Sequence, residues 1–92
     1  MAIRLVIPME AAPGKRAELV DTFRALSPNV RKEKGCLGYE LYQSTERPDQ
    51  MVLLELWSSE EDLANHSEMN RQRGLNLGPL RTGPSASERY TV

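Results

Sequence analysis

Residues 36–58 read CLGYELYQSTERPDQMVLLELWS, and this stretch decides the fold. Residues 36–44 and 50–58 are rich in aromatic and branched aliphatic side chains, which is typical of β-strands. Residues 45–49 (TERPD) lie between the two runs and have the composition of a turn. We therefore predict an antiparallel hairpin that closes symmetrically about Arg47-Pro48.

This closure sets which side chains share a face of the hairpin. It places Glu40 opposite Glu55 and Leu41 opposite Leu54. Because strand side chains alternate between two faces, one face is then almost entirely apolar: Leu37, Tyr39, Leu41, Val52, Leu54 and Leu56. The other face is mixed: Gly38, Glu40, Tyr42, Leu53, Glu55 and Trp57. We expect the apolar face to pack on helices and the mixed face to meet a second sheet or a ligand.

The segments before the hairpin predict one strand and two helices. Residues 2–8 form a strand that ends at Pro8, since proline cannot donate to a sheet ladder. Apolar spacing over residues 19–26 predicts an amphipathic helix that stops before Pro28. Ser27-Pro28 then starts a short second helix with Ser27 as its N-cap. Gly35 is the expected C-terminal cap, because glycine adopts the left-handed conformation at little cost.

After the hairpin, Ser58 or Ser59 is the expected N-cap of another helix. The face of this helix toward the sheet carries Leu63, His66 and either Met69 or Asn70. Glycine and proline interrupt residues 74–84, and residues 86–92 predict a last strand. Long irregular segments in compact domains are lids or mobile loops, and the sequence leaves open whether residues 70–85 form a lid.

This order of elements predicts one α+β domain over residues 1–92 with the ferredoxin-like βαββαβ topology. The topology implies an antiparallel four-stranded sheet, in the spatial order 4-1-3-2, with the helices on one face. Arg4 on the first strand then neighbours Glu55, so we expect Arg4 to neutralise the opposed carboxylates of Glu40 and Glu55. Two such sheets packed face to face would cover each other's mixed side chains.

Composition excludes several classes of protein. The chain has 92 residues, of which 12 are basic and 13 acidic, and its net charge of -1 lacks the basic face of a nucleic-acid binder. One cysteine, Cys36, excludes an intramolecular disulfide. The N-terminal apolar run is short and contains Arg4, which is unlike a signal peptide or membrane span, so we expect a cytoplasmic protein. A hydrophobic fraction of 39% gives a marginal core at this size, which favours a core shared with a second copy.

A set of short motifs occurs in one order and spacing along the chain. They are Gly14, residues 33–40 (EKGCLGYE), residues 55–57 (ELW) and residues 63–66 (LANH). Over about residues 1–80 this arrangement resembles the antibiotic biosynthesis monooxygenase domain. The resemblance implies a homodimeric α+β barrel of two ferredoxin-like chains, with a small-molecule pocket between the sheet and the helices of each.

Members of that family differ in chemistry, so the resemblance leaves three functions open. Some oxidise polyketide phenols or quinols with molecular oxygen and no bound cofactor, and this is our first hypothesis. The second is an isomerase of a small phosphorylated metabolite, and the third is a non-catalytic small-molecule-binding dimer. Haem-degrading members carry an asparagine on the first strand and a second tryptophan on the helix after the hairpin. This chain has Ile7 and His66 there, so the resemblance argues against haem.

His66 and Tyr39 are the candidate catalytic residues. His66 is the only histidine, and its side chain type titrates near neutrality. It is either a base or a structural residue at a helix–sheet junction. Tyr39 either hydrogen-bonds a substrate oxygen or packs in the core. Trp57 either stacks on an aromatic ligand or packs in the core or at a dimer interface. Cys36 is either a small buried hydrophobe or a reactive thiol.

The remaining candidates are polar. Asn65 is a weaker substrate-binding candidate than its neighbour His66, because it points about 100° away around the helix. Three arginines either capture an anionic substrate or are solvated; they are Arg71, Arg73 and Arg81. Glu40 and Glu55 either act as an acid–base pair or pair with Arg4. No metal site is expected, since one histidine is too few for most such sites.

Overall fold

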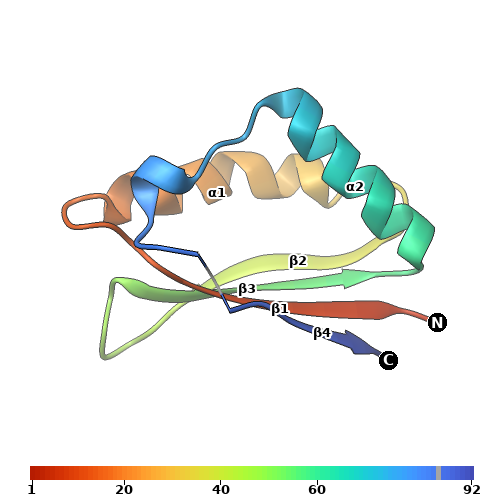
Figure 1. Ribbon diagram of the computed structural model, residues 1–92, viewed down its shortest axis with the longest axis horizontal. Helices are drawn as coiled ribbons and strands as arrows, with labels where there is room; N and C mark the ends of the chain where they lie inside the picture. The colour runs from red at the N-terminus through yellow and green to blue at the C-terminus, as the bar shows by residue number, and fades with distance from the viewer. Residues whose placement is uncertain (85) are drawn as a thin grey trace.

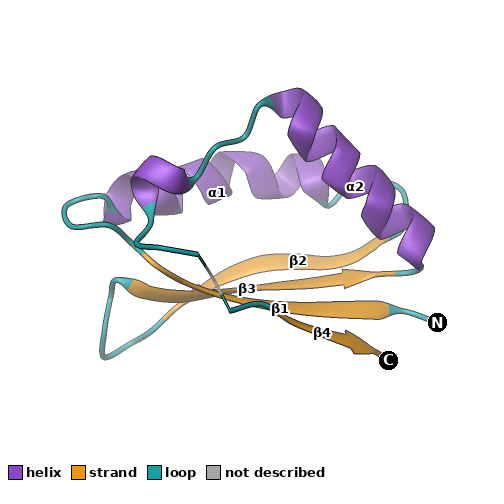
Figure 2. Ribbon diagram, viewed as in Figure 1, coloured by secondary structure: helices purple, strands orange, loops and turns teal. Residues whose placement is uncertain are grey.

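The computed structural model describes residues 1–84 and 86–92 as a four-stranded sheet with two helices on one side (Figure 1). The elements in chain order are β1 (Ile3–Glu10), α1 (Arg16–Val30), β2 (Cys36–Gln43), β3 (Gln50–Trp57), α2 (Glu60–Arg73), a 3-10 turn (Gly78–Leu80) and β4 (Glu88–Thr91). Paired strands are antiparallel in the order β2-β3-β1-β4, and Figure 2 shows the helical layer above the strands. The predicted ferredoxin-like α+β fold and its strand order are therefore confirmed.

Strand β1 continues through Pro8, where the sequence predicted its end. β4 pairs only with Ile3–Val6 of β1, so the later residues of β1 have β3 as their one partner strand. Backbone groups of a strand point alternately to its two edges, and those of Ala2 and Glu10 bond to the C-terminal segment. Pro8 faces that same edge, so its missing N–H interrupts no bond with β3.

Helix α1 also continues through a proline, so the predicted break before Pro28 is wrong. The N–H of Arg31 donates to the carbonyl of Ser27 at 3.0 Å. A backbone hydrogen bond of the helical type therefore spans Pro28. Pro28 stands in the last turn, where it removes a single backbone bond. The C-cap is Arg31, not Gly35. Gly35 lies in the following loop at φ 80°, where a Cβ would be 2.1 Å from the carboxylate of Asp62.

The hairpin of β2 and β3 forms as predicted, but its register differs by one residue. Leu41 pairs with Leu53 instead of Leu54, and a bulge interrupts the pairing near the start of β2. The turn causes the shift, because the N–H of Ser44 donates to the carbonyl of Gln50 at 2.8 Å. The Ser44 hydroxyl also accepts the N–H groups of two turn residues. The loop is thus centred half a residue earlier than symmetric closure assumes.

A shift of one residue exchanges the faces of β3 relative to β2. The sheet face toward the helices, called here the covered face, carries Ile3, Met9, Tyr39, Met51, Leu53, Glu55 and Trp57. The opposite face, called the open face, carries Arg4, Val6, Glu40, Tyr42, Val52, Leu54 and Leu56. The expectation that Glu55 and Trp57 face away from the helices is therefore wrong, as is the placement of Val52, Leu54 and Leu56 beneath them.

The predicted neighbourhood of Arg4 changes with the register. Arg4 lies opposite Leu56 on the open face, whereas Glu55 lies opposite Leu5 on the covered face. Glu40 is on the open face, so the sheet separates it from Glu55. The expected cluster of one arginine and two opposed carboxylates does not form.

Helix α2 closes the covered face beside α1, which contributes the buried side chains Leu19, Phe23 and Val30. Ser59 is its N-cap, as predicted, and accepts the N–H of Asp62 at 3.1 Å. Gly74 ends the helix at φ 68°, a conformation that favours glycine. The lid considered for residues 70–85 includes Ser85, which lies outside the described residues. Within residues 1–84 and 86–92, no helix is long and apolar enough to cross a membrane.

Candidate functional site

His66 packs against the covered face from α2. It stands on α2 three residues after Leu63, on the side of the helix that packs on the sheet, and 4% of its surface is exposed. Its ring stacks on Trp57 with centroids 4.5 Å apart and an interplanar angle of 27°. Tyr39 meets the same ring edge-on at 5.8 Å. The structure therefore brings together three of the predicted site residues, one from each of α2, β3 and β2.

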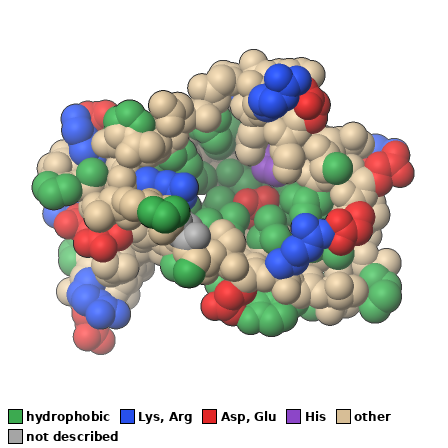
Figure 3. Space-filling model, viewed as in Figure 1, with side chains coloured by type: hydrophobic (Ala, Val, Ile, Leu, Met, Phe, Trp, Pro, Cys, Tyr) green, Lys and Arg blue, Asp and Glu red, His purple; other side chains and the backbone are tan. Residues whose placement is uncertain are grey.

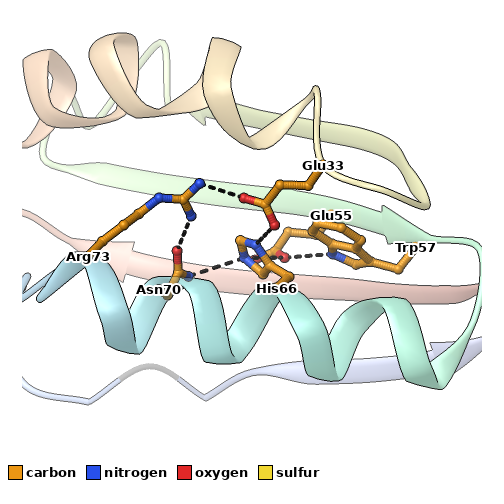
Figure 4. A network of polar contacts seen from close by, with 6 residues as sticks. All are labelled: Glu33, Glu55, Trp57, His66, Asn70 and Arg73. Atoms are coloured by element: carbon orange, nitrogen blue, oxygen red, sulfur yellow. Dashed lines mark hydrogen bonds and ion pairs between the residues drawn. The ribbon is translucent and has the colours of Figure 1, made fainter.

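Four polar side chains form a closed ring of hydrogen bonds that includes His66 (Figure 4). Arg73 donates to Glu33 Oε2 at 2.7 Å, and Glu33 Oε1 lies 2.9 Å from His66 Nδ1. His66 Nε2 lies 3.2 Å from Asn70 Nδ2, and Asn70 Oδ1 accepts from Arg73 at 2.8 Å. We call these residues the polar ring.

Local structure explains how the polar ring assembles. Asn70 and Arg73 follow His66 by four and seven residues, which places all three on one side of α2. Glu33 belongs to the loop between α1 and β2. Its N–H donates to the Val30 carbonyl and its own carbonyl accepts from Cys36, so the loop backbone is held at both ends. The Glu33 side chain is only 5% exposed, and two donors satisfy its carboxylate.

Donor and acceptor chemistry fixes every bond direction in the polar ring. Arginine has donors only, so the Asn70 atom that faces Arg73 is its oxygen. The amide nitrogen of Asn70 therefore faces His66 Nε2, and it can only donate there. Nε2 is consequently the unprotonated nitrogen of a neutral imidazole, and Nδ1 carries the proton that it donates to Glu33. A neutral histidine held in this tautomer is an available base.

Glu55 approaches the same imidazole from the sheet. Its Oε1 accepts the indole N–H of Trp57 at 2.9 Å and lies 3.7 Å from His66 Nε2. Burial raises the pKa of Glu55 above its usual value, while the Trp57 hydrogen bond and His66 act in the opposite direction. Two carboxylates, Glu33 and Glu55, therefore flank one histidine in a site that water barely reaches.

Tyr39 contributes a hydroxyl on the covered face. Its oxygen makes no hydrogen bond with the described residues, although only 4% of the residue surface is exposed. Burial, followed by the negative charges of Glu55 and Glu33, raises the pKa of Tyr39 well above its ordinary value. The phenol stays protonated near neutral pH, so Tyr39 can donate a hydrogen bond but cannot act as a base.

An open pocket of about 520 Å³ adjoins the polar ring at Asn70. Its lining comes from α2 and the segment after it: Ser67, Asn70, Arg71, Leu75, Asn76, Leu77, Gly78 and Arg81. No histidine or acidic side chain of the described residues lines this pocket; the hollow visible in the space-filling view, where histidine, acidic and hydrophobic side chains gather, is a separate feature of the surface (Figure 3). Asn70 belongs both to the polar ring and to the lining of this pocket.

Other predicted residues lie apart from His66. Asn65 is exposed, in agreement with its expected direction around the helix. Arg71 is exposed and forms an ion pair with Glu68, whereas Arg73 is used within the polar ring. Cys36 is half-buried, and burial raises the pKa of its thiol, which is the state of an unreactive cysteine.

Two residues of the polar ring were not predicted as site residues from the sequence. Glu33 occurs in a motif that suggested the family, but no role was assigned to it. Asn70 was considered only as a packing position. The spacing His66-Asn70-Arg73 on one helix face was the available signal, whereas the contact with Glu33 joins residues 33 positions apart. No group of three or more His, Cys, Asp or Glu side chains within residues 1–84 and 86–92 is arranged to hold a metal ion.

Comparison with known proteins yields one family and a set of similar structures. The model of the family described as antibiotic biosynthesis monooxygenase matches residues 2–73. A conserved protein from Methanosarcina mazei superposes with a TM-score of 0.88 at 27% identity, covering 98% of this chain and 91% of that one. A Caulobacter crescentus protein, named as a candidate antibiotic biosynthesis monooxygenase, gives 0.85 at 29% identity, covering 97% and 87%. Protein PA3566 of Pseudomonas aeruginosa gives 0.84 at 25%, covering 97% and 91%. No curated protein matches the sequence.

Proposed function

The chain belongs to the antibiotic biosynthesis monooxygenase family, and from this premise we propose that it oxidises a phenolic or quinol-like small molecule with molecular oxygen and without a cofactor. Membership supports a monooxygenase-like function in general. The observation that carries the proposal is the polar ring, which holds His66 with an unprotonated Nε2 and whose member Asn70 lines a pocket.

Such a reaction needs a base and a site that excludes water. A phenol becomes able to pass electrons to oxygen once it is deprotonated, so the protein must take its proton. A C–O bond then forms at a ring carbon, and the O–O bond and the C–H bond of that carbon break. One phenol and one oxygen molecule give one quinone and one water, with four electrons passing from substrate to oxygen.

The residues around His66 have distinct parts in this proposal. His66 Nε2 accepts the phenolic proton, and the nearby carboxylates of Glu33 and Glu55 stabilise the imidazolium that results. Tyr39 donates a hydrogen bond to a substrate oxygen. Trp57 provides an aromatic wall and orients Glu55 through its indole N–H. These roles need no metal ion or bound cofactor.

Oxygen uptake by metal-free protein tests the proposal. We expect consumption of oxygen with an anthrone or a hydroquinone in the presence of a chelator. His66→Ala should reduce the rate by about 10²–10⁴-fold, the usual contribution of a general base. Asn65→Ala is the matched control, since Asn65 is the exposed neighbour on the same helix. Full activity in a variant that combines His66→Ala with Tyr39→Phe would contradict the assignment of these residues.

A second function has one observation in its favour. The pocket beside Asn70 is lined by Arg71 and Arg81, and arginine binds phosphate through a planar fork of donors. An isomerase of a small phosphorylated metabolite would use this pocket for its anionic group. Inorganic phosphate should then raise the thermal unfolding midpoint, and an unchanged midpoint would count against the isomerase. If the protein binds phenols but consumes no oxygen, the third function, a non-catalytic small-molecule-binding dimer, is the one supported.

We also propose that the chain is a homodimer whose two open faces pack together. Val52, Leu54 and Leu56 form an apolar row on β3 of that face, and Tyr42 and Tyr90 are about half exposed. Contiguous apolar surface of this kind marks an association site. The dimeric barrel implied by the family resemblance would cover this row.

A further inference from the structure

We propose that Asn70 is a substrate-binding residue, which occupies the lone pair of His66 Nε2 in the empty protein and yields that position to the hydroxyl of an entering phenol. Arg73 is then the positioning residue that aims the amide. This inference rests on the proposed function, because it assigns the atoms that receive the phenol at the same site.

The surroundings of His66 Nε2 leave one position for a substrate hydroxyl. Two groups of the described residues lie near it, Asn70 Nδ2 at 3.2 Å and Glu55 Oε1 at 3.7 Å. One face of the imidazole is stacked on Trp57 and its other nitrogen is bonded to Glu33. A hydroxyl that donates to Nε2 must therefore take the place of the Asn70 amide.

The Asn70 amide is held so that it can exchange partners. Its oxygen accepts from Arg73 at 2.8 Å, and this bond keeps the nitrogen turned toward His66. The nitrogen carries two hydrogens, and one of them is used, in a bond at the long end of the normal range. The second hydrogen has no acceptor among the described residues.

The position of Asn70 links the base to the pocket. Asn70 is half-buried and contributes to the lining of the pocket on α2, whereas His66 is almost wholly buried. A small molecule that enters from the pocket therefore meets the amide before it meets the imidazole. Its oxygen can accept from Asn70 Nδ2 while its hydrogen points at His66 Nε2.

This exchange favours the deprotonated substrate. When the phenolic proton moves to Nε2, the oxygen becomes negative, and its bond from Asn70 becomes charge-assisted and stronger. The proton stays on His66, between the carboxylates of Glu33 and Glu55. An aspartate at position 70 would instead repel the phenolate, and an alanine would donate nothing.

Nuclear magnetic resonance of the single histidine tests the exchange without any variant. Protein labelled with ¹⁵N-histidine shows one imidazole, because the chain contains one His. The bond directions of the polar ring predict a protonated Nδ1 and an unprotonated Nε2. Titration with phenol in the absence of oxygen should move the Nε2 resonance far more than that of Nδ1. An Nε2 resonance that stays in place up to the solubility limit of phenol would overturn the proposal.

Matched variants give the kinetic test. Asn70→Ala should lower kcat for oxygen uptake by about 10²-fold, as loss of a donor to a developing oxyanion does, while Asn65→Ala stays within about twofold. In Asn70→Asp the carboxylate accepts instead of donating, so Nε2 should carry a proton in the spectrum. An Asn70→Ala variant as active as Asn65→Ala would overturn the inference alone. Absence of oxygen uptake with every phenol, together with the expected Nε2 shift, would overturn the proposed function and leave the binding role of Asn70 in place.

Discussion

The two faces of the sheet depart in opposite ways from the usual distribution of polar and apolar side chains. The covered face, which lies under the helices, contains the buried carboxylate of Glu55 and packs against His66. The open face, which no described element covers, presents the apolar row Val52, Leu54 and Leu56. Ordinary folding places apolar side chains inside and charges outside. This contrast supports the two proposals made above, chemistry on the covered face and association of two chains through the open face.

Each face needs a different compensation. A buried charge is tolerated when it is paired and hydrogen-bonded, and the polar ring supplies such bonds beneath the helices. Apolar side chains in water are compensated when a partner covers them, and on the open face the proposed second copy of the chain would be that partner. Substitutions that remove a bond of the polar ring or charge the apolar row should therefore have large effects on stability or association. Matched substitutions elsewhere should have small effects.

The largest effect is expected on the open face. Leu56→Lys would place an ammonium group directly opposite Arg4, so a dimer would bury two such like-charged groups, each at a cost of several kcal/mol. We expect the dissociation constant to rise by at least about 10³-fold, since each 1.4 kcal/mol is a factor of about ten. Analytical ultracentrifugation should show the mass of one chain in place of two.

Met69 supplies the control for this experiment. It is a large apolar side chain, 41% exposed, on α2 away from the sheet, and Met69→Lys should leave the mass unchanged. A wild-type protein that sediments as one chain at all concentrations would contradict the association of open faces.

The next effect belongs to the polar ring. Arg73→Met leaves the carboxylate of Glu33 buried with one donor fewer, and the loss of one partner of a buried pair costs about 3–5 kcal/mol. We expect the lower end, about 3 kcal/mol, because 26% of the Arg73 side chain is exposed. Arg71→Met removes an ion pair between exposed side chains and should cost less than about 1 kcal/mol. If urea unfolding shows that Arg73→Met and Arg71→Met lose the same free energy of unfolding, the polar ring is no more than a surface network.

Glu55 gives the covered face a dependence on pH. Its pKa is raised in the folded protein, so the stability linked to this group is complete below the unfolded value of 4.5 and declines as pH rises through the folded value. Glu55→Gln keeps an acceptor for Trp57 but removes the charge. The free energy of unfolding of the variant should therefore rise relative to that of the wild type from about pH 4 upward, by about 1.4 kcal/mol for each pKa unit of the shift. Urea unfolding at several pH values measures this difference. A difference that stays constant with pH would contradict the buried ionisation.

Sequence patterns predicted the elements of this fold better than their register. The strands of the hairpin follow from their residue types, but the face of Glu55 depends on which carbonyl Ser44 bonds to, and composition carries no such information. His66 was recognisable because it is the only histidine and lies on the inward side of a helix. Glu33 was not, because its role depends on a contact that only the tertiary structure creates.

The smallest expected effect concerns the start of α2, the helix that carries most of the polar ring. Ser59→Ala removes the acceptor of the Asp62 N–H, and loss of an N-cap costs about 1 kcal/mol. Asn65→Ala, an exposed change within the same helix, should cost less than about 0.5 kcal/mol. Oxygen uptake should be the same in both variants, because Glu33 holds His66 from outside the helix. If Ser59→Ala lowers the rate in folded protein, the helix start places His66, and the polar ring follows the helix instead of anchoring it to the sheet.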